Sequence, residues 1–119
     1  MKVRCTRLED AFGNPYPGTR SNSLTVGQVY HVLEIYCTEA DMSYRILADG
    51  GAPVIKFAKS FDIIEPDVPD FWKVSITGTD EPSLRIGPEE WDGDFWVRYF
   101  NLEKSARAAF KRQLQRTIG

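Results

Sequence analysis

The stretch YRILADGGAPVIKF, residues 44–57, predicts two short strands joined by a tight turn. Asp49, Gly50 and Gly51 stand at its centre, and glycine accepts the positive φ angles that hairpin turns demand. β-Branched and aromatic residues on both sides of the turn favour extended structure. The segment therefore predicts an antiparallel β-hairpin.

Three segments outside this hairpin also read as strands. Residues 2–8 alternate polar and apolar side chains, which is typical of a half-buried strand. Residues 24–37 are rich in Val, Ile and Tyr, and residues 60–65 form a further short apolar run. Residues 9–23 collect Gly, Pro, Asn and Ser and predict a long surface loop. Five short strands with turn-rich joints predict a small barrel or a curled sheet.

The rest of the chain predicts a second hairpin followed by helices. Residues 71–76 and 83–86 form the two arms of the hairpin. Asp94 is placed to cap a short aromatic helix over residues 95–100, and apolar residues at helical spacing predict a helix over residues 102–117. We therefore expect one α+β domain (residues 1–119) made of a small antiparallel β-barrel over residues 1–66 and a hairpin with C-terminal helices over residues 67–119.

Charge is distributed unevenly along the chain, although the net charge of the 119 residues is only −2. Residues 62–94 carry ten acidic against two basic side chains, a net of −8. Residues 1–61 have a net charge of +1 and residues 95–119 a net charge of +5. The overall balance argues against a general nucleic-acid binder. An acidic segment with embedded aromatic residues suits docking onto a basic partner.

The sequence lacks the residue sets that most enzymes need. His31 is the only histidine, which excludes a multi-histidine zinc site. His31 and Cys37 lie six residues apart on one expected strand, about 20 Å, which is too far for proton transfer. Neither a phosphate-cradling nor a dinucleotide-binding glycine motif occurs. We expect a protein that is not an enzyme and has no catalytic residue, metal or cofactor.

The cysteines and the N-terminus favour the cytoplasm. Cys5 and Cys37 lie far apart in the sequence without the spacing of a metal or redox motif, so we expect free, partly buried thiols. The first residues contain no apolar run typical of a secretory signal, and no run is long enough to cross a bilayer.

Aromatic residues gather in the C-terminal part, and most are expected in the core. Trp91 differs because it stands between Glu90 and Asp92 on an expected turn. It is either a core side chain or an exposed anchor surrounded by acids, the kind of residue that dominates an interface. The sequence leaves both possibilities open.

Two sets of residues carry a resemblance to known families. The first set is the runs 24–32, 44–47, 49–50 and 61–64 together with Phe57, and it resembles a bacterial SH3-like barrel. The second set is the runs 68–69, 71–75, 84–91, 94–96 and 99–100. This part is similar to small bacterial immunity proteins that accompany polymorphic or contact-dependent growth-inhibition toxins.

The resemblance implies a binder that holds one cognate toxin domain in an inactive one-to-one complex, by covering its active site or an exosite. Such toxins are frequently basic nucleases, which the acidic segment would complement. The family gives no contact residues to transfer by position, so the expected toxin-binding residues come from charge and aromatic placement alone: Asp80, Glu81, Glu89, Glu90, Trp91, Asp92 and Asp94.

Two other functions remain open at this point. A generic SH3-like interaction module would bind a peptide or regulatory partner through its strand edges and the loop of residues 9–23. Nucleic-acid binding would use the basic helix, although the neighbouring acidic segment weakens that hypothesis. The residues available for it are Arg107, Lys111, Arg112 and Arg116. We expect neither a direct nucleic-acid contact nor a membrane contact.

Overall fold

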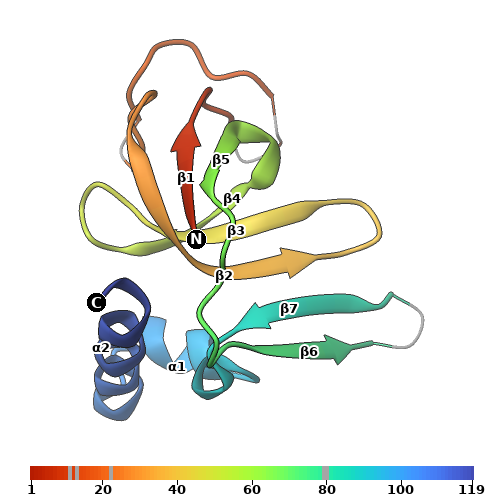
Figure 1. The fold of residues 1–119 in the computed structure, drawn as a ribbon, viewed down its shortest axis with the longest axis vertical. Helices are drawn as coiled ribbons and strands as arrows, with labels where there is room; N and C mark the ends of the chain where they lie inside the picture. Colours follow the sequence, from red (N-terminus) through yellow and green to blue (C-terminus); the bar gives the residue numbers. More distant parts are fainter. Residues whose placement is uncertain (11, 13, 22, 79–80) are drawn as a thin grey trace.

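A computed structural model covers residues 1–119 and describes all of them except 11, 13, 22, 79 and 80. It has an α+β architecture in which antiparallel strands precede two C-terminal helices (Figure 1). The strands are β1 (Lys2–Cys5), β2 (Val29–Cys37), β3 (Met42–Leu47), β4 (Pro53–Phe57), β5 (Phe61–Glu65), β6 (Lys73–Thr77) and β7 (Ser83–Gly87). The helices are α1 (Phe95–Phe100) and α2 (Lys104–Ile118), with short 3-10 turns η1 (Ala58–Ser60) and η2 (Glu89–Trp91).

The sheet is organised around β2, which has different neighbours along its length. Its first residues pair with β1, whereas residues 35–37 pair with β7. The strand order is β4-β3-β2-β1-β5, and β6 lies outside β7. Among the described residues β4 and β5 do not pair with each other, so the expected barrel is not closed. The chain turns through η1 after β4, and β5 then pairs only with β1.

Several expected boundaries were wrong for local reasons. The strand expected from residue 24 begins at Val29, because Gly27 adopts a φ of +92° and the Gln28 N–H bonds the Thr25 carbonyl in a turn. The last helix begins at Lys104, because Leu102 adopts a φ of 63° and separates it from α1. Asp94 precedes α1 as expected, but its side chain does not cap the helix and instead accepts a hydrogen bond from Arg98. The second hairpin is confirmed as β6 and β7.

Two clusters of buried apolar residues lie on opposite sides of β2, and a β-bulge separates them. The register with β3 shifts between Val32 and Glu34, so that Leu33 has no partner in the ladder. A bulge turns two successive side chains toward one face. Leu33 and Glu34 therefore both point toward the helices, where Leu33 packs beside Trp91, whereas Val32 packs into the barrel-side core.

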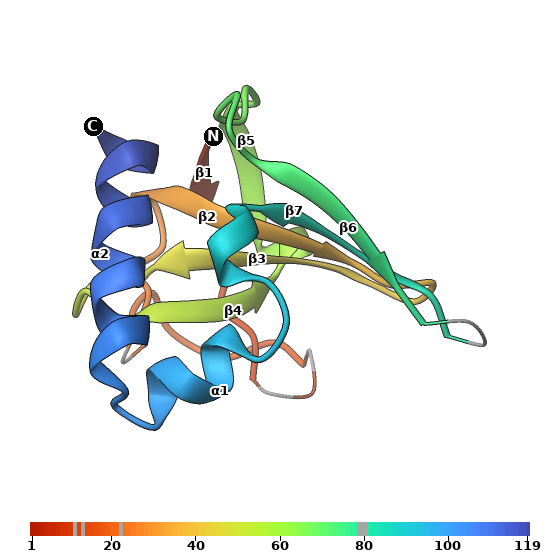
Figure 2. The same cartoon turned by 90° about the horizontal axis from the view of Figure 1, so that it is seen from below.

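Figure 2 shows the result of this division, with α1 and α2 on one side of the sheet and the β6–β7 hairpin projecting beyond them. None of the described helices is long and apolar enough to cross a membrane.

Leu33 should be a strong determinant of stability because it is fully buried beneath the helices. We expect Leu33→Ala to lower the free energy of unfolding by about 2–5 kcal/mol, because it leaves a cavity in a packed core. The same substitution at Leu102, which is 71% exposed, should change it by about 0.5 kcal/mol or less. Urea denaturation of both variants measures the difference, and equal losses would contradict the assignment of Leu33 to the second core.

Candidate protein-binding surface

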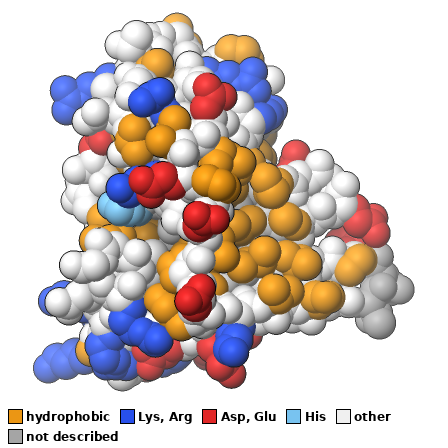
Figure 3. All heavy atoms as spheres, viewed as in Figure 1, with side chains coloured by type: hydrophobic (Ala, Val, Ile, Leu, Met, Phe, Trp, Pro, Cys, Tyr) orange, Lys and Arg blue, Asp and Glu red, His pale blue; other side chains and the backbone are white. Residues whose placement is uncertain are grey.

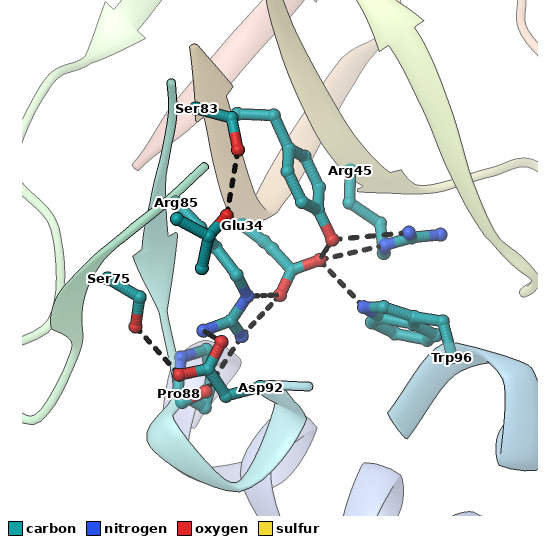
Figure 4. A network of polar contacts seen from close by, with 10 residues as sticks. Glu34, Arg45, Ser75, Ser83, Arg85, Pro88, Asp92 and Trp96 are labelled. Atoms are coloured by element: carbon teal, nitrogen blue, oxygen red, sulfur yellow. Dashed lines mark hydrogen bonds and ion pairs between the residues drawn. The ribbon is translucent and has the colours of Figure 1, made fainter. Parts of the chain in front are cut away.

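A fully buried carboxylate, that of Glu34, holds the helix-facing side of the sheet together (Figure 4). Its Oε1 accepts hydrogen bonds from Arg45 Nε at 3.0 Å and from Trp96 Nε1 at 2.8 Å. Its Oε2 accepts one from Arg85 Nε at 2.6 Å. The Tyr36 hydroxyl also donates to Oε1. Glu34 thus connects β2 with β3, β7 and α1.

Two guanidinium groups share this one carboxylate, so the buried centre carries a surplus positive charge. Asp92 supplies the balance at the border, with Oδ1 3.7 Å from Arg85 Nη1. A hydrogen bond from the Ser75 hydroxyl at 2.7 Å lowers the pKa of Asp92 and holds it ionised beside the network. The Arg45 guanidinium also stacks 3.8 Å above the Trp96 ring. The network is therefore matched in charge, whereas Arg85 Nη1 is buried without a hydrogen-bond acceptor and has only the ion pair with Asp92.

The same strands present an apolar surface on their other side. Paired residues in an antiparallel sheet share a face, and so do residues two apart on one strand. Two rows of paired residues across the strands therefore lie on one face. They are Ile76–Leu84–Cys37–Met42 and Val74–Ile86–Ile35. We call its accessible part the open face, which consists of Cys37, Met42, Val74, Ile76, Leu84 and Ile86.

The open face remains uncovered in the folded chain. The Val74 side chain is 61% exposed and that of Ile76 is 69% exposed. Figure 3 shows hydrophobic side chains gathered over the β6–β7 hairpin and the strands beside it. Contiguous exposed apolar surface of this kind marks a protein-interaction site more often than scattered apolar residues do.

Acidic residues border this surface. The turn between β2 and β3 carries Glu39 and Asp41, and the turn before β7 carries Glu81. Asp67 and Asp70 are exposed residues of the linker from β5 to β6, which crosses the same side of the molecule (Figure 1). The described residues of the two turns include no lysine or arginine. The border of the open face is therefore negative.

Three of the five described acids in the expected toxin-binding set are paired within the chain. Glu90 accepts hydrogen bonds from Arg112 and Gln113, which lower its pKa. Asp92 belongs to the buried network, and Asp94 pairs with Arg98 at 3.2 Å. These three acids therefore have arginine partners within the chain and do not form one free acidic patch, although the Asp94 side chain is itself 77% exposed.

The other residues of the expected toxin-binding set differ from one another in exposure. Trp91 is 1% exposed and stacks between Phe95 and Phe110, so the exposed-anchor alternative for it is wrong. Its ring is large enough to fill the space where η2 meets both helices. Glu81 and Glu89 are exposed, and Glu81 lies at the border of the open face. Asp80 lies outside the described residues.

Most of the basic residues on the last helix also contact other side chains of this chain. Arg107 stacks 3.9 Å over Tyr99, Arg116 stacks 3.9 Å over Phe71, and Arg112 pairs with Glu90. Lys111 is exposed. Three of the four cations proposed for phosphate contacts thus have partners within the chain.

The two thiols and the one histidine lie on β1 and β2. Cys5 and Cys37 are free, and burial raises the pKa of the Cys5 thiol. Burial lowers the pKa of His31, which pairs across the ladder with Lys2. Within the part of the chain that the structure describes, no group of three His, Cys, Asp or Glu side chains is placed to hold a metal ion.

The open face was missed by sequence reasoning, although its signal was present. Residues 73–77 alternate Lys, Val, Ser, Ile and Thr, and residues 83–87 place Leu84 and Ile86 at the same period. Alternation identifies an apolar face. It does not say whether another element covers that face, because the covering element is chosen by tertiary packing.

Comparisons with protein-family models, with curated proteins and with solved structures give no match to this chain.

Removal of the Glu34 charge should destabilise the fold strongly. Glu34→Gln leaves Arg45 buried without a counterion and Arg85 with only the more distant carboxylate of Asp92, and we expect a loss of about 3–5 kcal/mol in the free energy of unfolding. The same substitution at Glu90, whose pair with Arg112 is solvent-accessible, should cost about 1 kcal/mol or less. Chemical denaturation followed by tryptophan fluorescence compares the two. An equal midpoint for Glu34→Gln and wild type would refute the central role of Glu34.

Proposed function

We propose that this protein is an immunity protein that binds and neutralises a cognate bacterial toxin domain of basic charge. The observation that carries the proposal is the open face, an exposed apolar sheet surface with acids along its border. A partner with an apolar centre and a basic rim fits both features. The proposal places the binding surface on the β6–β7 side of the sheet, with Glu81 as the residue retained from the acidic set.

The physical chemistry of this surface suits fast and specific association. Burial of apolar side chains such as Val74 and Ile76 supplies the attraction at the centre of an interface. The surrounding acids steer a basic partner toward the surface and disfavour acidic ones. An immunity protein of this kind needs no chemistry of its own, because it acts by covering the toxin's active site or an exosite. We propose the cytoplasm as the place where this occurs.

We further propose that residues 1–66 form an SH3-like module. Support comes from the order of five antiparallel strands, the long loop after the first strand and the 3-10 turn before the fifth. In this proposal the module is the scaffold that presents β2 and β3, on which the hairpin β6–β7 is built.

A second candidate function is peptide binding by this module at another surface. A cavity of about 600 Å³ lies between the long loop, β3, β4 and η1. Tyr16, Leu24, Ile55 and Phe57 form apolar walls, and the nearly buried carboxylate of Glu9 lies beside it, paired with Arg7 at 3.1 Å. This mixture of apolar and polar groups suits a peptide segment.

Co-expression with the toxin domain encoded immediately upstream tests the proposed function. We expect a stable one-to-one complex on co-purification and rescue of growth. Ile76→Glu should weaken the complex at least tenfold, because it places a charge at the centre of the apolar contact. Val97→Glu is the matched control, since Val97 is 65% exposed but lies on α1, away from the open face.

The combined variant Glu39→Gln, Asp41→Asn and Glu81→Gln measures the contribution of the border. We expect slower association and a weaker dependence on salt, because steering by these acids is lost. A complex that tolerates Ile76→Glu but is lost on Tyr16→Ala would favour the peptide-binding module. Failure to form any complex or to rescue growth would contradict the immunity proposal.

A further inference from the structure

The outer edge of β6 differs from the other two edges of the sheet. β6 pairs with β7 alone, and Figures 1 and 2 both show it at the border of the sheet. An uncovered edge strand presents free backbone N–H and C=O groups that can pair with another chain. Native proteins normally protect such edges with proline, charges, bulges or a covering element.

The other two edges carry these protective features. β4 begins with Pro53 and has Lys56 within it. β5 contains Asp62 and ends at Glu65, and its register with β1 is shifted between Lys2 and Val3. β6 has no proline, its five pairs with β7 run without a shift, and its one charge is at its first residue. The unprotected edge is therefore confined to β6.

We propose that two copies of this chain associate through antiparallel pairing of β6 with β6 of the second copy, about a twofold axis at Ser75. This register sets Val74 opposite Ile76 of the second copy, so the two open faces join into one continuous surface. On the other face Lys73 lies opposite Thr77, and no like charges are directly opposed. The segment of residues 73–77 is therefore complementary to itself.

Charge also favours the edge over the open face as the site for a second copy. Two open faces packed against each other would bring Glu39, Asp41 and Glu81 of both copies together. In the edge pairing, the hairpin turn with Glu81 extends toward Lys73 of the second copy, at both ends of the interface. Near the axis, Asp92 is balanced by Arg85 of its own chain at 3.7 Å. This inference does not depend on the proposed toxin binding.

The size of the contact sets the expected affinity. A five-residue strand is about 17 Å long, and its pairing buries less than the roughly 800 Å² per partner of a typical stable complex. We therefore expect a weak dimer, with a dissociation constant on the order of 10–100 µM. Sedimentation velocity on the wild-type chain from about 5 µM to about 1 mM should show monomer converting to dimer.

A charge exchange tests the register. Thr77→Lys places a lysine opposite Lys73 at both ends, and we expect it to raise the dissociation constant at least tenfold. The double variant Lys73→Glu/Thr77→Lys restores opposite charges at the same positions and should dimerise at least as well as wild type. Both sites are exposed in the monomer, so circular dichroism should show an unchanged fold.

Cross-linking gives an independent measurement of the same geometry. Directly opposed residues have Cα atoms about 4.5–5.5 Å apart, within disulfide range, so Ser75→Cys should form a covalent dimer under mild oxidation. Thr77→Cys is the matched control, because its copies would lie about 14 Å apart along the strands. Wild type controls for the native thiols. A monomeric wild type at 1 mM, a Thr77→Lys variant that dimerises normally, or equal cross-linking of both cysteine variants would overturn the proposal.

Discussion

The desolvation of the Glu34 carboxylate is the constraint on which the rest of the structure depends. A carboxylate without solvent is tolerated only where cations and hydrogen-bond donors surround it. Here those groups come from three further elements: Arg45 from β3, Arg85 from β7 and Trp96 from α1. Because one carboxylate needs all of them, the second hairpin and the helix cannot shift independently relative to β2. Close packing adds to this constraint, since a methyl group on Gly87 would lie 3.3 Å from the Glu34 side chain.

This arrangement determines which face of the sheet is covered. The network and the aromatic cluster require the helices to lie over the polar side of β2, β3 and β7. The 15-residue helix α2 and the short helix α1 both lie on that side. Nothing else in the described chain is left to cover the opposite side near β6, so Val74 and Ile76 remain exposed. The polar face is buried and part of the apolar face is open, which is the reverse of what burial of apolar area alone would favour. That inversion is the strongest structural reason to look for a partner there.

The sequence predicted the positions of the strands and helices better than it predicted which of their side chains are buried. The turn at residues 49–51, the hairpin of β6 and β7 and the helical C-terminus follow from local signals, because glycine, alternation and helical spacing act over a few residues. The register shift beside Leu33 and the burial of Glu34 do not, since both are set by partners 11, 51 and 62 residues away in the chain. Trp91 illustrates the same limit. Its acidic neighbours suggested exposure, yet the ring is enclosed by Phe95 and Phe110, and its burial depends on the packing of α2 against η2.

The acids of residues 62–94 fall into two groups, those that pair within the chain and those that face solvent. Glu90, Asp92 and Asp94 face Arg112, Arg85 and Arg98, and Glu65 lies 3.7 Å from Lys2. Among the described residues, these four acids of the segment thus have an ion-pair partner within the chain. The acids that remain beside the open face, among them Glu81, Asp67 and Asp70, are those whose charge a partner would meet. A charge count along the sequence therefore cannot separate acids that pair with arginines of the same chain from acids that face solvent, because the pairing depends on tertiary contacts.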